Sequence, residues 1–297
     1  MNNIFPYLIL ILSSVLSAAQ AGVSKLYSKK YGNSMDGIYK FSTFTGFTYV
    51  LIMLIPKLIK GTFLSITPFS LIVAFGLAFF NAVGIIFMFS IFKYGAVSLY
   101  VLFSKLGTLL LPTLFAVIFL QEKLTIGKML CIVCIIAALI ITIDFSKSKS
   151  SKKVYIFYFG IFLSSGLVGV LISLHQKNQV FEKVSGNDLT TLLMLWYGII
   201  CLIVYILLSI KNKSFQKTEN KPLFFSLSIG NGLLYGLSTI LLAVALLYVP
   251  SSVQYPLSSG LAIVFGGIVG LFFKEKITVK FLISTVFVVL GTIALSL

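Results

Sequence analysis

The chain has 297 residues, of which 59% are hydrophobic and 10% are charged, and its mean hydropathy is +1.08. Soluble domains are roughly half apolar and about a quarter charged, so this composition excludes an ordinary soluble domain and predicts a helical membrane protein. The net charge of +16 argues little for nucleic-acid binding, because it comes from lysines in short segments between apolar runs, with no arginine in the chain.

Ten apolar stretches, most near 20 residues, are separated by short Lys-rich or Gly-rich breaks, and a helix of that length crosses about 30 Å of hydrocarbon. The first stretch lacks the positive charges that precede a signal peptide's apolar region, so we interpret it as a transmembrane helix. The predicted spans are 5–24, 41–59, 70–92, 96–120, 126–144, 154–174, 189–210, 223–247, 250–273 and 279–297.

Two of these stretches are copies of each other. The segment 98–125 and the segment 251–278 both start with serine at a polar break, run on as an apolar helix, and end in Glu-Lys-(Leu/Ile)-Thr. The glutamates are Glu122 and Glu275, so the offset between the copies is 275 − 122 = 153 residues. A further apolar span follows each copy, which indicates an internal duplication of a membrane unit.

The duplication gives two halves of five spans each, 1–146 and 154–297, joined by the polar connector 144–153. Because five is odd, the second copy must enter the membrane from the opposite side. The sequence therefore predicts an all-α membrane protein whose ten transmembrane helices form two inverted five-helix repeats.

Apart from Lys105, the lysines lie between the spans or within three residues of a span end, and they are distributed unevenly, with 16 after odd-numbered spans and 6 after even-numbered spans. The positive-inside rule places the lysine-rich side in the cytoplasm, and hence both termini outside.

Two five-span halves, each ending in a helix, a Glu-Lys-(Leu/Ile)-Thr turn and a final helix, resemble the EamA-type transporters of the drug/metabolite transporter superfamily over essentially the whole chain. The Gly-Glu-x-(Leu/Ile)-Thr turn usual in that family is QEKLT at 121–125 and KEKIT at 274–278 here, so both copies lack the glycine. Pro112 matches a proline common in the fourth span, whereas the ninth span has Pro256 at a different depth.

The resemblance implies a transporter of amino acids, nucleotide sugars, other metabolites or drugs, and many bacterial members of the family are exporters. It also implies that both termini are cytoplasmic. The lysine distribution predicts the reverse, so the sequence leaves the orientation open.

Lys105 is the only charged residue deep in a span, about 14 Å along the fourth helix at 1.5 Å per residue. An intramembrane lysine costs roughly 2.5–3.5 kcal/mol on insertion scales and usually faces a polar interior. Ser98, Lys105, Thr108 and Pro112 are 7, 3 and 4 residues apart, which places them on one helix face. We therefore expect Lys105, Ser98 and Thr108 to bind substrate.

The ninth span carries a matching polar face with Gln254, Tyr255 and Ser258, of which Ser258 is the duplicate of Lys105. We expect these residues to bind substrate where the fourth and ninth spans meet. The alternative for each is a hydrogen bond between helices, worth about 0.6 kcal/mol on average.

Asn81, Asn231 and Tyr235 are further polar residues of the spans and complete the expected site. For the two asparagines, a hydrogen bond to a neighbouring helix is the favoured reading and a place in the cavity lining is the alternative. Outside the site, we expect His175 to be a solvated interface residue and Asp188 to be the N-cap of the seventh span.

Together these features predict a secondary transporter in the cell membrane that moves a small metabolite, an amino acid or a related organic solute, by alternating access. A charged Lys105 favours an anionic group on that substrate. We expect a monomer or homodimer with no cofactor, no metal and no nucleic-acid partner. No acid lies deep in a span, so facilitated diffusion, exchange and proton coupling all stay open.

A non-transporting membrane protein, such as a scaffold or a lipid-handling subunit, is the alternative. It predicts polar groups paired from helix to helix around no continuous cavity. An enzyme is disfavoured, because the sequence has no H-E-x-x-H or G-x-S-x-G motif and no His or Asp deep in a span.

Overall fold

The computed structural model describes residues 4–94, 96–119, 121–142, 149–212, 221–245, 247–249 and 251–294, except for the side chains of residues 94, 149–153 and 251–256. The described residues form ten α-helices and no strand. The helices are α1 (Phe5–Tyr31), α2 (Met35–Ile59), α3 (Pro68–Tyr94), α4 (Val97–Ile118), α5 (Ile126–Thr142), α6 (Lys149–Lys177), α7 (Gly186–Lys211), α8 (Lys221–Ala245), α9 (Ser251–Phe272) and α10 (Val279–Ala294).

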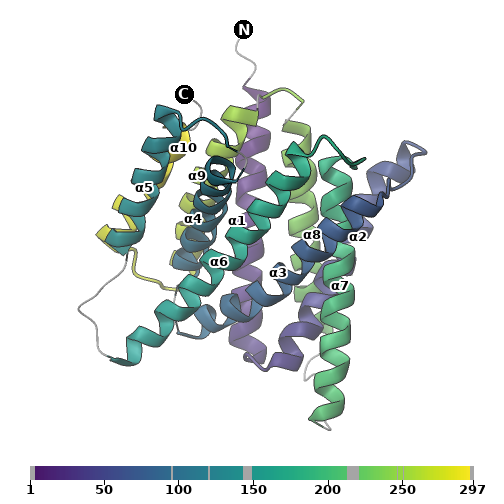
Figure 1. Cartoon of the computed structure of the whole chain (residues 1–297). Coiled ribbons are helices and arrows are strands. Elements are labelled where there is room, and N and C mark those ends of the chain that lie inside the picture. The colour runs from purple at the N-terminus through teal and green to yellow at the C-terminus, as the bar shows by residue number, and fades with distance from the viewer. Residues whose placement is uncertain are drawn as a thin grey trace.

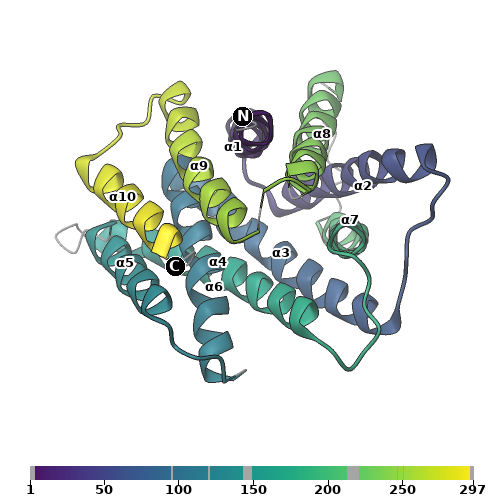
Figure 2. The same ribbon diagram turned by 90° about the horizontal axis from the view of Figure 1, so that it is seen from above.

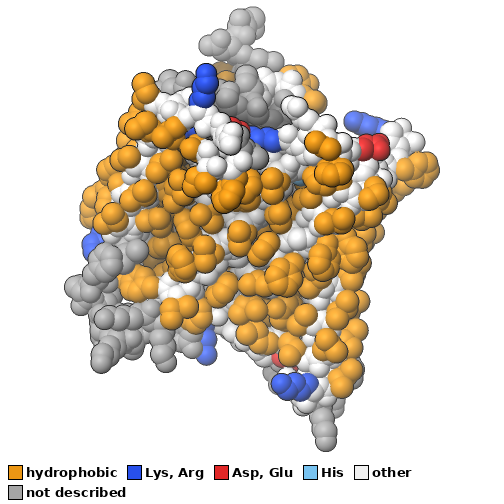
Figure 3. Space-filling view, in the orientation of Figure 1, with side chains coloured by type: hydrophobic (Ala, Val, Ile, Leu, Met, Phe, Trp, Pro, Cys, Tyr) orange, Lys and Arg blue, Asp and Glu red, His pale blue; other side chains and the backbone are white. Residues whose placement is uncertain are grey.

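Seven helices, α1 to α4 and α6 to α8, are long and apolar enough to cross a membrane, and the described parts of α5, α9 and α10 are shorter apolar helices. The protein is therefore a multi-pass helical membrane protein, as its composition predicts. Figure 3 agrees with this, since hydrophobic side chains cover the middle of the molecule and the visible charged side chains lie towards its ends.

Each predicted span overlaps one helix, but the helices α1 and α2 extend past the predicted ends. The prediction placed a loop from 25 to 40, because lysines and serines interrupt the apolar run there. Instead, Lys25 continues α1, is only 6% exposed, and donates from Nζ to the Phe92 carbonyl at 2.5 Å. Charged residues end the apolar stretch but not the helix, because they find partners within the protein.

The two halves of the chain interlock rather than forming separate bundles. The helix pairs with the most contact are α4 with α6, α1 with α8, α2 with α7, α5 with α10 and α3 with α6, and each joins one half to the other. Figure 1 and Figure 2 show α5 and α10 side by side at one edge of the molecule, with α1 among helices of the second half.

The crossing of α2 and α7 is close because it is made by two glycines. A Cβ added to Gly46 would lie 3.1 Å from the Cα of Gly198. Towards the end of α2, Lys57 pairs with Asp188 at the start of α7. The two helices therefore run antiparallel.

The two Glu-Lys-(Leu/Ile)-Thr turns share an uncommon backbone conformation. Gln121 has φ +51° and Lys274 has φ +60°, and they are the described non-glycine residues with positive φ. Residues other than glycine seldom adopt this left-handed conformation. Both residues occupy the position that is glycine in the family with the resembling turn.

The glutamates of the two turns make different contacts. Glu275 accepts hydrogen bonds from the backbone N–H groups of Val97 and Ser98, at 2.7 and 3.3 Å, and so caps the start of α4. Glu122 instead pairs with Lys128, at 2.8 Å, and with Lys177. The hydrogen bonds from these two ammonium groups hold the pKa of Glu122 below its ordinary value.

Candidate functional site

A cavity of about 290 Å³, lined by both polar and apolar side chains, lies among eight helices, α1 to α4 and α6 to α9. Five of the residues that we expected to bind substrate line it: Lys105, Thr108, Asn81, Asn231 and Tyr235. They come from α3, α4 and α8, so the fold brings together side chains that are far apart in the sequence.

Among the described residues that line the cavity, Lys105 is the one that carries a charge. It is half-buried, and within the described part of the chain its Nζ has no hydrogen-bond or ion-pair partner. Its neighbours on α4 are already engaged: Thr108 donates to the Lys105 carbonyl at 2.9 Å, and Ser104 shares a 2.9 Å hydrogen bond with Ser165 of α6. The ammonium therefore has no counter-charge from the described residues.

A network of amides closes the α1 side of the cavity. The Nε2 of Gln20 donates to the Oδ1 of Asn231 at 3.0 Å, and the Nδ2 of Asn231 donates to the Gln20 carbonyl at 3.0 Å and to the Ser24 Oγ at 2.8 Å. The expected hydrogen bond to a neighbouring helix is therefore confirmed for Asn231. For Asn81 it is wrong, because its Nδ2 donates to the Leu77 carbonyl of its own helix at 2.9 Å.

Ser98 lies outside the cavity lining, because its Oγ donates to Glu275 at 3.2 Å at the start of α4. Ser258 also lies outside the lining. Gln254 and Tyr255 fall outside the described side chains. Among the described residues, α4 contributes five to the lining and α9 contributes Ala262 alone. The side chains of residues 251–256 in α9 lie outside the described part, so the expected frame of two helices stays a prediction.

The prediction missed several hydroxyl-bearing residues, because serine and tyrosine in an apolar span carry no distinctive signal. Most come from helices that the duplicated segment does not include. The missed residues are Ser17, Ser24, Ser42, Thr45, Tyr100, Ser104, Ser164, Ser165 and Tyr197. The adjacent Ser164 and Ser165 beside Gly166 are the one local pattern that marks a polar face on α6.

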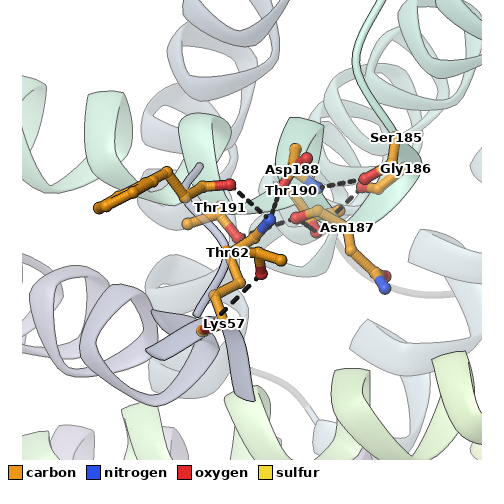
Figure 4. Close-up of polar contacts among 9 residues, drawn as sticks. Lys57, Thr62, Ser185, Gly186, Asn187, Asp188, Thr190 and Thr191 are labelled. Carbon is orange, nitrogen blue, oxygen red and sulfur yellow. Dashed lines mark hydrogen bonds and ion pairs between the residues drawn. The ribbon is translucent and has the colours of Figure 1, made fainter. Parts of the chain in front are cut away.

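At the end of the α2–α7 pair, an ion pair joins the two helices outside the cavity. Figure 4 shows the Lys57 Nζ reaching Asp188, with a separation of 2.5 Å from Oδ1. The Asp188 side chain is 6% exposed, so this carboxylate depends on Lys57 for its counter-charge. Our N-cap prediction for Asp188 is wrong, because Ser185 caps α7 by accepting from the Asp188 N–H at 3.2 Å.

His175 is also placed differently from our prediction of a solvated residue. It is 2% exposed, its ring stacks on Phe69 at 5.6 Å between centroids, and its Nε2 lies 2.9 Å from the Ser70 Oγ. The Ser70 Oγ also accepts from the Val184 N–H at 3.1 Å. His175 therefore joins α3, α6 and the segment before α7, and its polarity is satisfied inside the protein.

No cluster of His, Cys, Asp or Glu in the searched, described residues has the arrangement of a metal site. The sequence matches no family model and no curated protein.

Proposed function

We propose that the protein is a secondary transporter that binds a small organic metabolite in the central cavity and moves it by alternating access. The observation that carries the proposal is the cavity of about 290 Å³ among helices of both halves, with Lys105 in its lining and no partner for it among the described residues. Charged groups inside a membrane protein commonly mark a substrate or ion pathway, because burying a charge within the bilayer costs free energy.

We further propose that the ten helices all cross the membrane and form an inverted repeat. The contact between Gly46 and Gly198 supports this, because 198 − 46 = 152, close to the duplication offset. A residue that packs against its own duplicate lies beside the axis that relates the copies. Since Lys57 and Asp188 make α2 and α7 antiparallel, that axis is perpendicular to both helices and hence lies in the membrane plane.

The α5–α10 pair supports the same axis. A Cβ on Gly291 would lie 3.4 Å from the Cys131 carbonyl oxygen, and the Ser284 Oγ donates to the Ala138 carbonyl at 3.1 Å. The offset of 153 relates these two contacts, since 131 + 153 = 284 and 138 + 153 = 291. If a two-fold axis relates the halves, a contact between Cys131 and Gly291 must be matched by a contact between their equivalents, Ser284 and Ala138.

We propose membership of the EamA-type transporters from the resemblance of the two turns, and the helical architecture supports it. The turns of that family begin with glycine, which adopts a left-handed backbone conformation at the lowest cost. Gln121 and Lys274 have this conformation at the same position, which supports the proposal. We propose the cell membrane as location and a monomer or homodimer as the working form. The lysine distribution favours the lysine-rich end of the helices as the cytoplasmic one.

Alternating access requires contacts that open and close at the two ends of the cavity. Two polar contacts fit this role: Glu275 with the start of α4, and Lys57 with Asp188 between α2 and α7.

The non-transporting alternative expects paired polar groups and no cavity. The side-chain amide of Asn231 fits that expectation, but Lys105 lines a cavity and has no partner among the described residues, which favours transport.

The test is efflux from proteoliposomes loaded with a mixture of small metabolites, followed by mass spectrometry. We expect at least one solute to leave faster than from protein-free liposomes, and Lys105→Met to change its rate. Lys123→Met is the matched control, because Lys123 is exposed in the α4–α5 turn. Identical efflux with and without protein for every solute contradicts the proposal.

A further inference from the structure

The charges around the cavity are of one sign. Within the described part of the chain, Lys105 is the one charged side chain in the lining, and no Asp or Glu joins it there. Three described carboxylates have partners outside the cavity: Glu275 caps α4, Asp188 pairs with Lys57, and Glu122 pairs with Lys128 and Lys177.

From this we infer that the site takes a small, singly charged organic anion that carries hydroxyl groups and no ammonium group. The inference rests on the proposed transport function and specifies the substrate class for the same cavity. It excludes zwitterionic amino acids and organic cations.

The anion is required by Lys105. An ammonium in a region of low dielectric is unfavourable without a counter-charge, and a carboxylate or similar group on the substrate supplies one in a charge-assisted hydrogen bond. One lysine balances one negative charge, so a second anionic group on the substrate would itself be left unpaired.

A substrate ammonium has no counter-charge among the described residues of the lining. Lys105 repels it, and no described Asp or Glu lines the cavity to offset that repulsion. The hydroxyl and amide oxygens of the lining can accept a hydrogen bond, but they carry no negative charge. A buried cation left without a counter-charge is strongly disfavoured.

Hydroxyl groups on the substrate can form hydrogen bonds with free hydroxyl groups of the lining. Within the described residues, the side-chain hydroxyls of Ser17, Tyr100 and Tyr235 line the cavity without a hydrogen-bond partner. A hydroxyl can both donate and accept, so each of these can bind a substrate hydroxyl in either sense.

The size of the cavity limits the class further. A cavity of about 290 Å³ lies at the lower end of the range of roughly 300–1,000 Å³ that is usual for small-molecule sites. This size favours small solutes, such as hydroxy acids and short sugar acids, over a nucleotide sugar.

The experiment uses four solutes of nearly equal shape that differ in charge: glycerate (anion), serine (zwitterion), glyceramide (neutral) and serinamide (cation). The purified full chain is titrated with each solute, and the shift in melting temperature gives an apparent affinity. We expect glycerate to bind at least 10-fold more tightly than the other three. Lys105→Met should remove this preference, and Lys105→Arg should keep it.

Equal stabilisation by all four solutes, stabilisation by serine or serinamide above glycerate, or no stabilisation by glycerate overturns the inference. An unchanged glycerate preference in Lys105→Met overturns it as well. The comparison among solutes uses the parent protein alone, so it stands even if Lys105→Met fails to fold.

Liposome efflux separates this inference from the proposed function. Transport of serine or serinamide but not of glycerate would keep the transporter and reject the anion class. Glycerate binding at Lys105 with no solute crossing the bilayer would keep the site and reject transport.

Discussion

The helices α4 and α9 occupy equivalent places in the duplicated sequence, but the protein uses them differently. Five residues of α4 line the cavity, including Lys105, whereas Ala262 is the described residue of α9 that does so. The equivalent turns differ in the same way, because Glu275 caps α4 while Glu122 forms ion pairs at the surface. Among the described residues, the two similar segments of sequence therefore make different polar contacts.

The largest expected effect comes from moving the lysine between the copies. Lys105→Ser should weaken glycerate binding at least 10-fold, because a charge-assisted hydrogen bond is worth about 1.5–3 kcal/mol. Adding Ser258→Lys should not restore binding, because position 258 lies outside the cavity lining. The measurement is the melting-temperature titration, and recovery in the double variant would show that both copies reach the same site.

The next effect concerns packing at another equivalent pair, Gly107 and Gly260. A Cβ on Gly107 would run into the backbone carbonyl of Phe162 in α6, which cannot move aside easily, whereas a Cβ on Gly260 would meet only the Val289 side chain, at 3.1 Å. We expect Gly107→Ala to destabilise the protein by about 1–3 kcal/mol and Gly260→Ala by less than about 1 kcal/mol. Thermal unfolding in detergent measures both, and equal losses would contradict the difference between the copies.

The two turn glutamates should differ by a smaller amount. Glu275→Gln weakens the cap on α4 and should cost about 1 kcal/mol. Glu122→Gln removes ion pairs of a partly exposed carboxylate, so its cost should be below about 1 kcal/mol and should shrink further in high salt. A loss for Glu122→Gln that exceeds the loss for Glu275→Gln would reverse this order.

The smallest effect is a pH dependence specific to Glu122. Its pKa is lowered by Lys128 and Lys177, so its ion pairs contribute stability above the unfolded-state pKa of about 4.3, and this contribution is lost as the pH falls through the lower folded-state pKa. The melting temperatures of the parent and Glu122→Gln should therefore converge at the acidic end of this window. A constant gap between pH 7 and pH 3 would contradict it.

The periodic apolar stretches predicted where helices form, because length and composition control membrane insertion. They failed at residues 25–40, where Lys25 is buried against a carbonyl that only the folded chain supplies. Lys105 was predictable as a cavity residue because a charge deep in a span has few other places to lie. The serines and tyrosines were not, because in an apolar helix the same residue serves equally well in packing, in bonding to its own backbone, or in a cavity.

The interlocking of the halves has a consequence for how the protein is made. The principal partners of α1 are α8 and α9, and α8 begins 221 − 31 = 190 residues after α1 ends. At a synthesis rate of 5–20 residues per second, α1 waits in the lipid for roughly 10–40 s before its partners are made. During that time Gln20 and Ser24 lack Asn231, so these polar side chains stay without that partner until α8 has been made.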